Sequence, residues 1–121
     1  MSAERSPQRI IHSVAPIRIC DNGGWTDTWF AEYGTIFNIG VYPYAEVEIQ
    51  IFDRGDVDDR IVIHAENYGE RFAVAPVGGA SHHPLLEAAV EYMEIPHDDA
   101  FELTIYCGAL AGCSTGTSAA V

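Results

Sequence analysis

The sequence predicts an α+β fold in which a mixed or antiparallel sheet is covered by helices on one side. Two observations carry this prediction. Several segments alternate apolar and polar residues with the period of a strand, and one segment, 81–93, has the period of a helix. Because no internal repeat or linker divides the 121 residues, we expect residues 1–121 to lie within one domain.

Four strand-like segments follow from composition. The stretch IIHSVAPIRIC (10–20) reads as an extended segment that Pro16 interrupts, and GTIFNIG (34–40) is a short apolar run between glycines. The clearest strand is 45–52, where apolar residues alternate with polar ones, so one face should be buried. The segment 101–107 alternates in the same way and is expected to be the last strand.

A hairpin is predicted in the middle of the chain. Residues 60–65 (RIVIHA) and 70–75 (ERFAVA) read as two strands joined by the turn ENYG. The acidic segment that precedes them, 53–59, is interpreted as a solvated turn.

The segment 81–93 is predicted to be a helix. Ser81 or His83 is suited to cap it, and Pro84 suits its first turn. The adjacent His82 and His83 are expected to lie at the surface or cap the helix, because neighbouring residues point apart and do not share a metal. The apolar residues at helical spacing are Leu85, Leu86, Ala89, Val90 and Met93.

Charge and cysteine content exclude several classes of protein. There are 18 acidic and 6 basic residues, a net charge of -12, which argues against binding to nucleic acid or to anionic membrane surfaces. No apolar stretch is long enough to span a bilayer, and the polar N-terminus lacks the apolar core of a secretory signal. Three cysteines without a C-x-x-C pair suggest neither a disulfide framework nor a zinc site, so we expect a cytoplasmic location.

Two glycine-containing motifs carry the functional interpretation. The first, APIRICDNGGWTDTWFAEYGTIFNIGV (15–41), joins a Pro-Arg strand to a Gly-Gly-aromatic-Thr-Asp loop and an apolar strand. The second, AGCSTGTSAAV (111–121), follows the last expected strand and begins a helix, the order that forms an anion site from free backbone N–H groups. It does not satisfy the Walker pattern, and taken alone it is equally consistent with an ordinary Gly/Ser surface loop.

Together, the two motifs resemble those of the GHMP kinases, the superfamily of galactokinase, homoserine kinase, mevalonate kinase and phosphomevalonate kinase. The first motif resembles the pattern A-P-x-R followed by G-G-x-[ST]-D, and the second resembles G-L-G-S-S-A. Within the superfamily the chain looks most like the sugar kinases that act on fucose or heptose phosphate. The resemblance extends over about residues 10–121 and is firm at 15–41 and 112–121.

The resemblance implies roles for residues of the first motif. Arg18 matches a basic residue that lies close to the reacting groups in some members, so it is the candidate catalytic residue. Asp27 matches a carboxylate that accepts hydrogen bonds from sugar hydroxyls. Trp25 either stacks on a sugar ring or packs in a core, and both interpretations stay open. The implied substrate-binding residues are Gly23, Gly24, Trp25, Thr26 and Asp27.

The second motif implies an ATP site. Residues 116–119 match G-S-S-A, the turn and helix start that surround the ATP phosphates, while Ser114 and Thr115 stand where the family has Gly and Leu. Ser118 is the candidate contact to Mg²⁺. The implied ATP-binding residues are Gly112, Ser114, Thr115, Gly116, Thr117, Ser118 and Ala119.

The resemblance therefore implies an enzyme that transfers the γ-phosphoryl group of MgATP to a hydroxyl of a hexose or heptose derivative. Galactokinases have Glu-His where this chain has Gly24 and Trp25, so galactose is the less expected substrate. The pattern looks like the first third of such a kinase, ending inside its ATP loop, so the chain alone is expected to be inactive and marginally stable or self-associated. The alternative is a non-catalytic sugar- or nucleotide-binding module that needs a partner chain.

Overall fold

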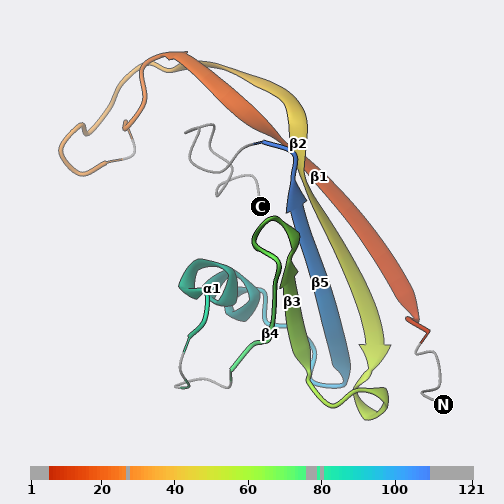
Figure 1. Cartoon of the computed structure of the whole chain (residues 1–121). Helices are drawn as coiled ribbons and strands as arrows, with labels where there is room; N and C mark the ends of the chain where they lie inside the picture. Colours follow the sequence, from red (N-terminus) through yellow and green to blue (C-terminus); the bar gives the residue numbers. More distant parts are fainter. Residues whose placement is uncertain (1–5, 27, 76–78, 80, 110–121) are drawn as a thin grey trace. The chain divides into compact units, whose positions relative to one another are not determined.

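The computed structural model describes residues 6–26, 28–75, 79 and 81–109 (Figure 1). By its contacts the chain forms two compact units, one from Met1–Ser13 and Val47–Tyr106 and the other from Val14–Glu46 and Cys107–Val121. The elements are β1 (Arg9–Asn22), β2 (Phe37–Asp53), β3 (Ile61–Ala65), β4 (Glu70–Ala73), α1 (Pro84–Tyr92) and β5 (Asp99–Cys107), with short 3-10 turns η1 (Arg54–Asp56) and η2 (Glu66–Tyr68).

The strands form a five-stranded sheet in the order β1-β2-β5-β3-β4. β3 is antiparallel to β4, with Ile63 opposite Phe72, and parallel to β5, with Ile63 opposite Leu103. The sheet is therefore mixed, which is one of the two arrangements that the sequence predicts. The predicted hairpin is also confirmed, and Gly69 closes it in the left-handed region at φ 65°.

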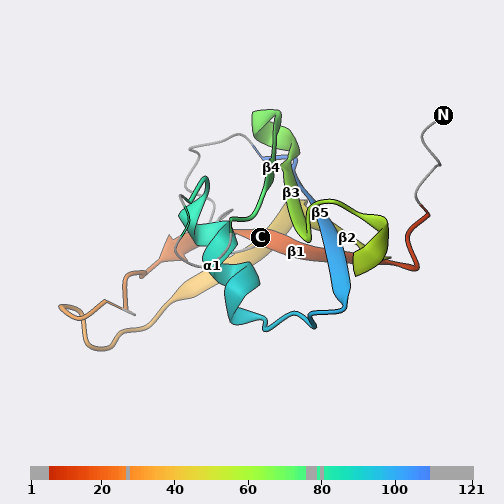
Figure 2. The same ribbon diagram turned by 90° about the horizontal axis from the view of Figure 1, so that it is seen from below.

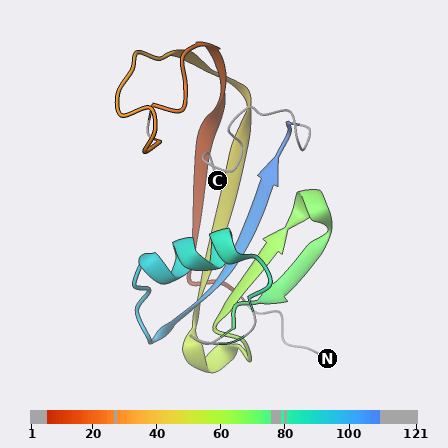
Figure 3. The same cartoon turned by 90° about the vertical axis from the view of Figure 1, so that its left-hand side faces the viewer.

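The first unit buries its core between α1 and the sheet. Ile63, which is fully buried, forms a cluster with Val90 of α1 and Ile105 of β5, and Leu86 of α1 packs against this cluster. Leu86 and Val90 are four residues apart, so both lie on the same face of the helix. Figures 2 and 3 show α1 against one face of the strands of this unit. α1 therefore packs against the strands of this unit, while the predicted covering of one side of the sheet by helices stays a prediction.

α1 begins later than the predicted range, because its first turn depends on Pro84 and on a capping carboxylate. His83 is the N-cap residue, and its side chain makes no capping hydrogen bond. The Glu87 carboxylate instead accepts hydrogen bonds from the backbone N–H groups of His82 (2.7 Å) and His83 (2.8 Å). The bond from His83 is the main cause that lowers the pKa of Glu87.

The second unit has a smaller core of its own. Ile17 of β1, Ala45 of β2 and Cys107 at the end of β5 are buried together, and Val41 packs against them. Val41 and Ala45 contact the same cluster, so the period-two pattern of β2 continues between them.

For two predicted strands, the predicted beginning or end differs from the observed one. Pro16 does not interrupt the first strand, because β1 lies at the edge of the sheet, where a residue without an N–H can be accommodated. The segments 34–40 and 45–52 do not form separate elements, since β2 runs without a break from Phe37 to Asp53.

Candidate functional site

The aromatic loop, which we define as residues 23–36, connects β1 to β2 in the second unit (Figure 1). Gly23 and Gly24 open it with φ angles of 78° and 126°, a region of backbone conformation that favours glycine. A Cβ atom on Gly23 would collide with the carbonyl oxygen of Thr35. The beginning and the end of the loop therefore approach each other closely, and this approach requires glycine at position 23.

Trp25 holds an unusual backbone conformation for a bulky residue. Its φ is 62°, in the left-handed region that side chains larger than Asn rarely adopt. Its carbonyl oxygen accepts hydrogen bonds from both the backbone N–H (3.0 Å) and the hydroxyl of Thr28. The Thr28 carbonyl in turn accepts a hydrogen bond from the N–H of Ala31 (3.1 Å). Successive turns therefore fix the backbone of this part of the loop.

Three rings of the loop form a cluster that we call the aromatic triad, Trp25, Trp29 and Phe30. Phe30 is its centre, with its ring 6.1 Å from that of Trp25 at 60° and 5.6 Å from that of Trp29 at 90°. Trp25 is 73% exposed and Trp29 is 90% exposed. Within the described part of the chain Trp25 does not pack in a core, so of the two interpretations left open by the sequence, core packing is not observed.

Arg18, the candidate catalytic residue, lies on β1 with its side chain exposed. Its neighbour Ile17 is buried in the core of the second unit, so Arg18 projects from the opposite face of the strand. Among the described residues, no hydrogen bond or ion pair joins Arg18 to the aromatic loop. The structure brings Gly23, Gly24, Trp25 and Thr26 together in one turn, while Asp27 and the predicted ATP-binding residues 112–119 lie outside the described residues.

The aromatic triad as a cluster was not predicted from the sequence, although a signal for it exists. Residues 25–33 contain Trp25, Trp29, Phe30 and Tyr33, an unusual density of aromatic residues for a loop that starts with two glycines. The sequence alone does not predict this cluster, because a list of aromatic residues does not show which of them touch.

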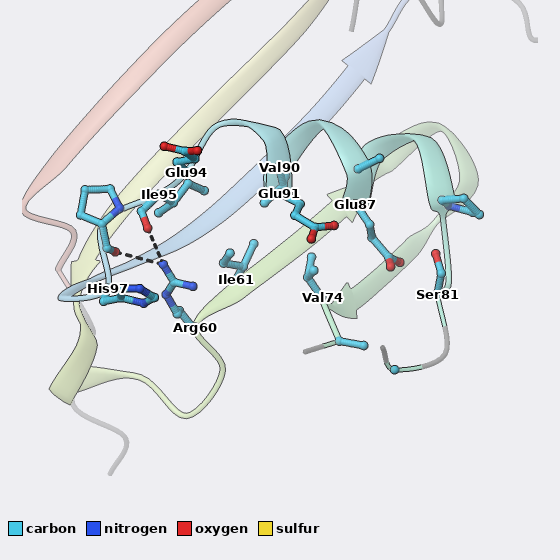
Figure 4. Close-up of a pocket in the computed structure, with 15 residues that line it drawn as sticks. Arg60, Ile61, Val74, Ser81, Glu87, Val90, Glu91, Glu94, Ile95 and His97 are labelled. Carbon is cyan, nitrogen blue, oxygen red and sulfur yellow. Dashed lines mark hydrogen bonds between the residues drawn. The ribbon is translucent and has the colours of Figure 1, made fainter. Parts of the chain in front are cut away.

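A hollow that we call the α1 groove lies in the first unit and has a volume of about 950 Å³. Figure 4 shows Ile61, Val74 and Val90 along it, with the carboxylates of α1 nearby. Arg60 reaches across one end, where its Nη2 donates hydrogen bonds to the carbonyl oxygens of Ile95 (2.7 Å) and Pro96 (3.1 Å). None of the sequence-predicted site residues that the structure describes lines this groove.

Two negative findings concern the part of the chain that the structure describes. No helix there is long and apolar enough to cross a membrane. No group of three or more His, Cys, Asp or Glu side chains there is placed to hold a metal ion.

Comparisons with known proteins found a similar fold in a solved structure. The chain matches no protein-family model and no curated relative. Its fold is similar to that of a solved sugar-phosphate kinase. That structure is a D-glycero-D-manno-heptose 1-phosphate kinase from Bacteroides thetaiotaomicron, with a TM-score of 0.58 and 21% sequence identity.

The match covers 91% of this chain and 37% of the heptose-phosphate kinase, so the chain spans little more than a third of that protein. At this sequence identity the match shows a shared fold. The resemblance to GHMP kinases of the heptose-phosphate type, which rested on two sequence motifs, is confirmed at the level of the fold.

Proposed function

We propose that residues 1–121 are the N-terminal part of an ATP-dependent sugar kinase of the GHMP type. The proposed reaction transfers the γ-phosphoryl group of MgATP to a hydroxyl of a hexose or heptose derivative. The observation that carries the proposal is the match of 91% of the chain to the fold of a heptose-phosphate kinase. The two motifs occur along the sequence in the order that the family has, which supports the same conclusion.

The proposed ATP site follows β5. An anion site of this kind needs a strand that is followed by a glycine-rich turn. β5 ends at Cys107 and Gly108 follows directly, so the strand and the first glycine of such a turn are present. We propose that residues 112–119 hold the ATP phosphates and that Ser118 faces Mg²⁺. ATP would supply the phosphoryl group, and the protein would contribute by positioning the reactants and neutralising charge.

The proposed sugar site is the aromatic loop. In this proposal Asp27 accepts hydrogen bonds from ring hydroxyls, Gly23 and Gly24 allow the loop to turn toward the substrate, and Arg18 contributes positive charge near the reacting groups. The observed φ angles of the two glycines and the exposure of Trp25 suit a loop that meets a ligand.

The proposal is tested by a coupled ADP assay on the protein that contains residues 1–121. Fucose, mannose, galactose, arabinose and heptose phosphates are supplied one at a time with MgATP. We expect ADP release to depend on one of these sugars. ADP release that is the same with and without every sugar would contradict the assignment.

A matched pair of variants tests the role of Asp27. Asp27→Ala should raise the sugar KM by about tenfold or more and leave the ATP KM unchanged, because losing a charged hydrogen bond costs about 1.5–3 kcal/mol. Asp59→Ala removes an exposed carboxylate of the acidic turn and should change neither constant. Equal sugar kinetics for the two variants would remove Asp27 from the site.

One feature of the sequence favours a second candidate, a sugar- or nucleotide-binding module without turnover. Ser114 stands where the family has the first glycine of its phosphate loop, and a Cβ there would crowd a phosphate. Calorimetric titration distinguishes the two candidates. Binding of sugar or ATP without any sugar-dependent ADP release would favour the module over the kinase.

A further inference from the structure

We propose that the aromatic triad is a stacking platform for the ring of the sugar substrate, and that Trp25 presents its indole to an apolar face of a pyranose. This inference rests on the proposed function, because it specifies how that sugar site recognises its ligand. It goes further by choosing stacking over core packing for Trp25 and by assigning the support of its indole to the other two rings of the triad.

The backbone of Trp25 lies in the left-handed region, at φ 62°. A bulky residue in the left-handed region is strained, and such strain persists only where the surrounding structure enforces it. Here the Thr28 N–H and hydroxyl both bind the Trp25 carbonyl and hold it in place. The strained backbone therefore holds in one position a side chain that is 73% exposed and lies outside the core. A strained residue with an exposed side chain points to a role in binding.

The geometry of the three rings also suits a stacking platform. Trp25 and Trp29 both meet Phe30 edge to face, and an edge-to-face contact covers at most one face of a ring. Contact with Phe30 therefore leaves at least one face of each indole uncovered by the Phe30 ring. The face of an aromatic ring is electron-rich and attracts weakly positive C–H groups, which one face of a pyranose displays in a row.

The charge of the aromatic loop suits a neutral ligand. Residues 23–36 contain Asp27 and Glu32 but no Lys or Arg. Carboxylates accept hydrogen bonds from hydroxyl groups and repel phosphates. The composition therefore favours a neutral, hydroxyl-rich ring at the triad, and a phosphate on the sugar would have to be bound elsewhere.

The test follows Trp25 directly by ¹⁹F NMR of the protein that contains residues 1–121, labelled with 5-fluorotryptophan. The Trp25 resonance is identified by its loss in Trp25→Phe. D-mannose, L-fucose, D-glycero-D-manno-heptose 1-phosphate and ATP are titrated separately. We expect one sugar to shift the Trp25 resonance saturably and ATP alone to leave it in place.

Three outcomes of this titration would overturn the proposal. The first is that none of the three sugars moves the Trp25 resonance. The second is that ATP alone moves it, which would make the triad a nucleobase platform. The third is a Trp25 resonance without the solvent isotope shift of an exposed indole in the sugar-free protein, which would show that another part of the protein covers the ring.

Kinetics with the sugar that supports turnover give a second, independent test. Trp25→Ala should raise the sugar KM by about tenfold, with the ATP KM unchanged, and Trp25→Phe should restore most of the loss because it retains an aromatic face. The control Tyr92→Ala removes an 86% exposed ring from α1 and should change neither constant.

The two proposals fail in different ways. An unchanged sugar KM in Trp25→Ala, in a protein that releases ADP only with sugar, would refute the platform and leave the kinase assignment standing. Absence of sugar-dependent ADP release would refute the kinase, while the ¹⁹F titration would still decide whether Trp25 binds a sugar. If Trp25→Ala does not fold, the sugar KM of the conservative variant Trp25→Phe and the ¹⁹F titration of the parent protein still test the proposal.

Discussion

Substituting Gly23 by alanine should destabilise the aromatic loop more than the same substitution at any open glycine position. Two effects act at this position. A residue with a Cβ at φ 78° pays about 1–2 kcal/mol for the left-handed conformation. The new Cβ would also collide with the Thr35 carbonyl oxygen, and relieving such overpacking costs about 1–3 kcal/mol more. We therefore expect a loss of about 2–4 kcal/mol in the free energy of unfolding, allowing for the small gain from a stiffer unfolded chain.

Two other glycines separate these effects. Gly69 has a φ of 65° and nothing within 4 Å of an added Cβ, so Gly69→Ala measures the conformational strain alone. Gly55 has neither a positive φ nor a close neighbour, so Gly55→Ala measures the background effect of alanine. The expected order of destabilisation is Gly23→Ala, then Gly69→Ala, then Gly55→Ala.

The assay is urea unfolding of the three variants and the parent, combined with the sugar KM of each. Only Gly23→Ala should raise the sugar KM, because only it displaces the loop that carries the triad. If Gly23→Ala is no more destabilising than Gly69→Ala, the close approach of Gly23 to Thr35 is not a real constraint and the reasoning fails.

Three further predictions concern the first unit. Ile63→Ala should lower the free energy of unfolding by about 2–5 kcal/mol, since Ile63 is fully buried, and urea unfolding measures this. Arg60→Met should cost about 1–3 kcal/mol in the same assay, because it removes the hydrogen bonds that tie the carbonyls of Ile95 and its neighbour to the start of β3. Glu87→Gln should lower the melting temperature near neutral pH. The pKa of Glu87 is lowered by the His83 N–H, so the charge stabilises the fold above the ordinary value of 4.5, and this contribution is lost as the pH falls through the lowered pKa.

Matched controls sharpen these three predictions. Ile39→Ala removes a side chain that is 50% exposed and should cost much less than the buried isoleucine. Arg54→Met removes one exposed hydrogen bond, to the Val57 carbonyl, and should be nearly neutral. For Glu87, a melting-temperature difference between parent and Glu87→Gln that stays constant from pH 7 down to acid would show that its charge does not cap α1.

Local patterns predicted much of this structure from the sequence. The strands at 60–65, 70–75 and 101–107 and the helix within 81–93 are found close to their predicted limits. The period-two pattern of a strand and the period-3.6 pattern of a helix are local properties of the chain, so they can be recognised in the sequence without knowledge of the fold. The turn at Gly23 and Gly24 could also be predicted from the local sequence, because the turn itself requires a backbone with positive φ, which glycine adopts readily.

Other features were decided by tertiary contacts. Pro16 is accommodated because β1 is at the sheet edge, and β2 runs through residues 37–53 because Val41 and Ala45 share one core. The aromatic triad depends on how the backbone around Thr28 folds back on itself, which side-chain composition does not encode. Alternation along a strand reveals that one face is buried but not which strand lies beside it, so the order β1-β2-β5-β3-β4 and the exposure of Trp25 are properties of the folded chain.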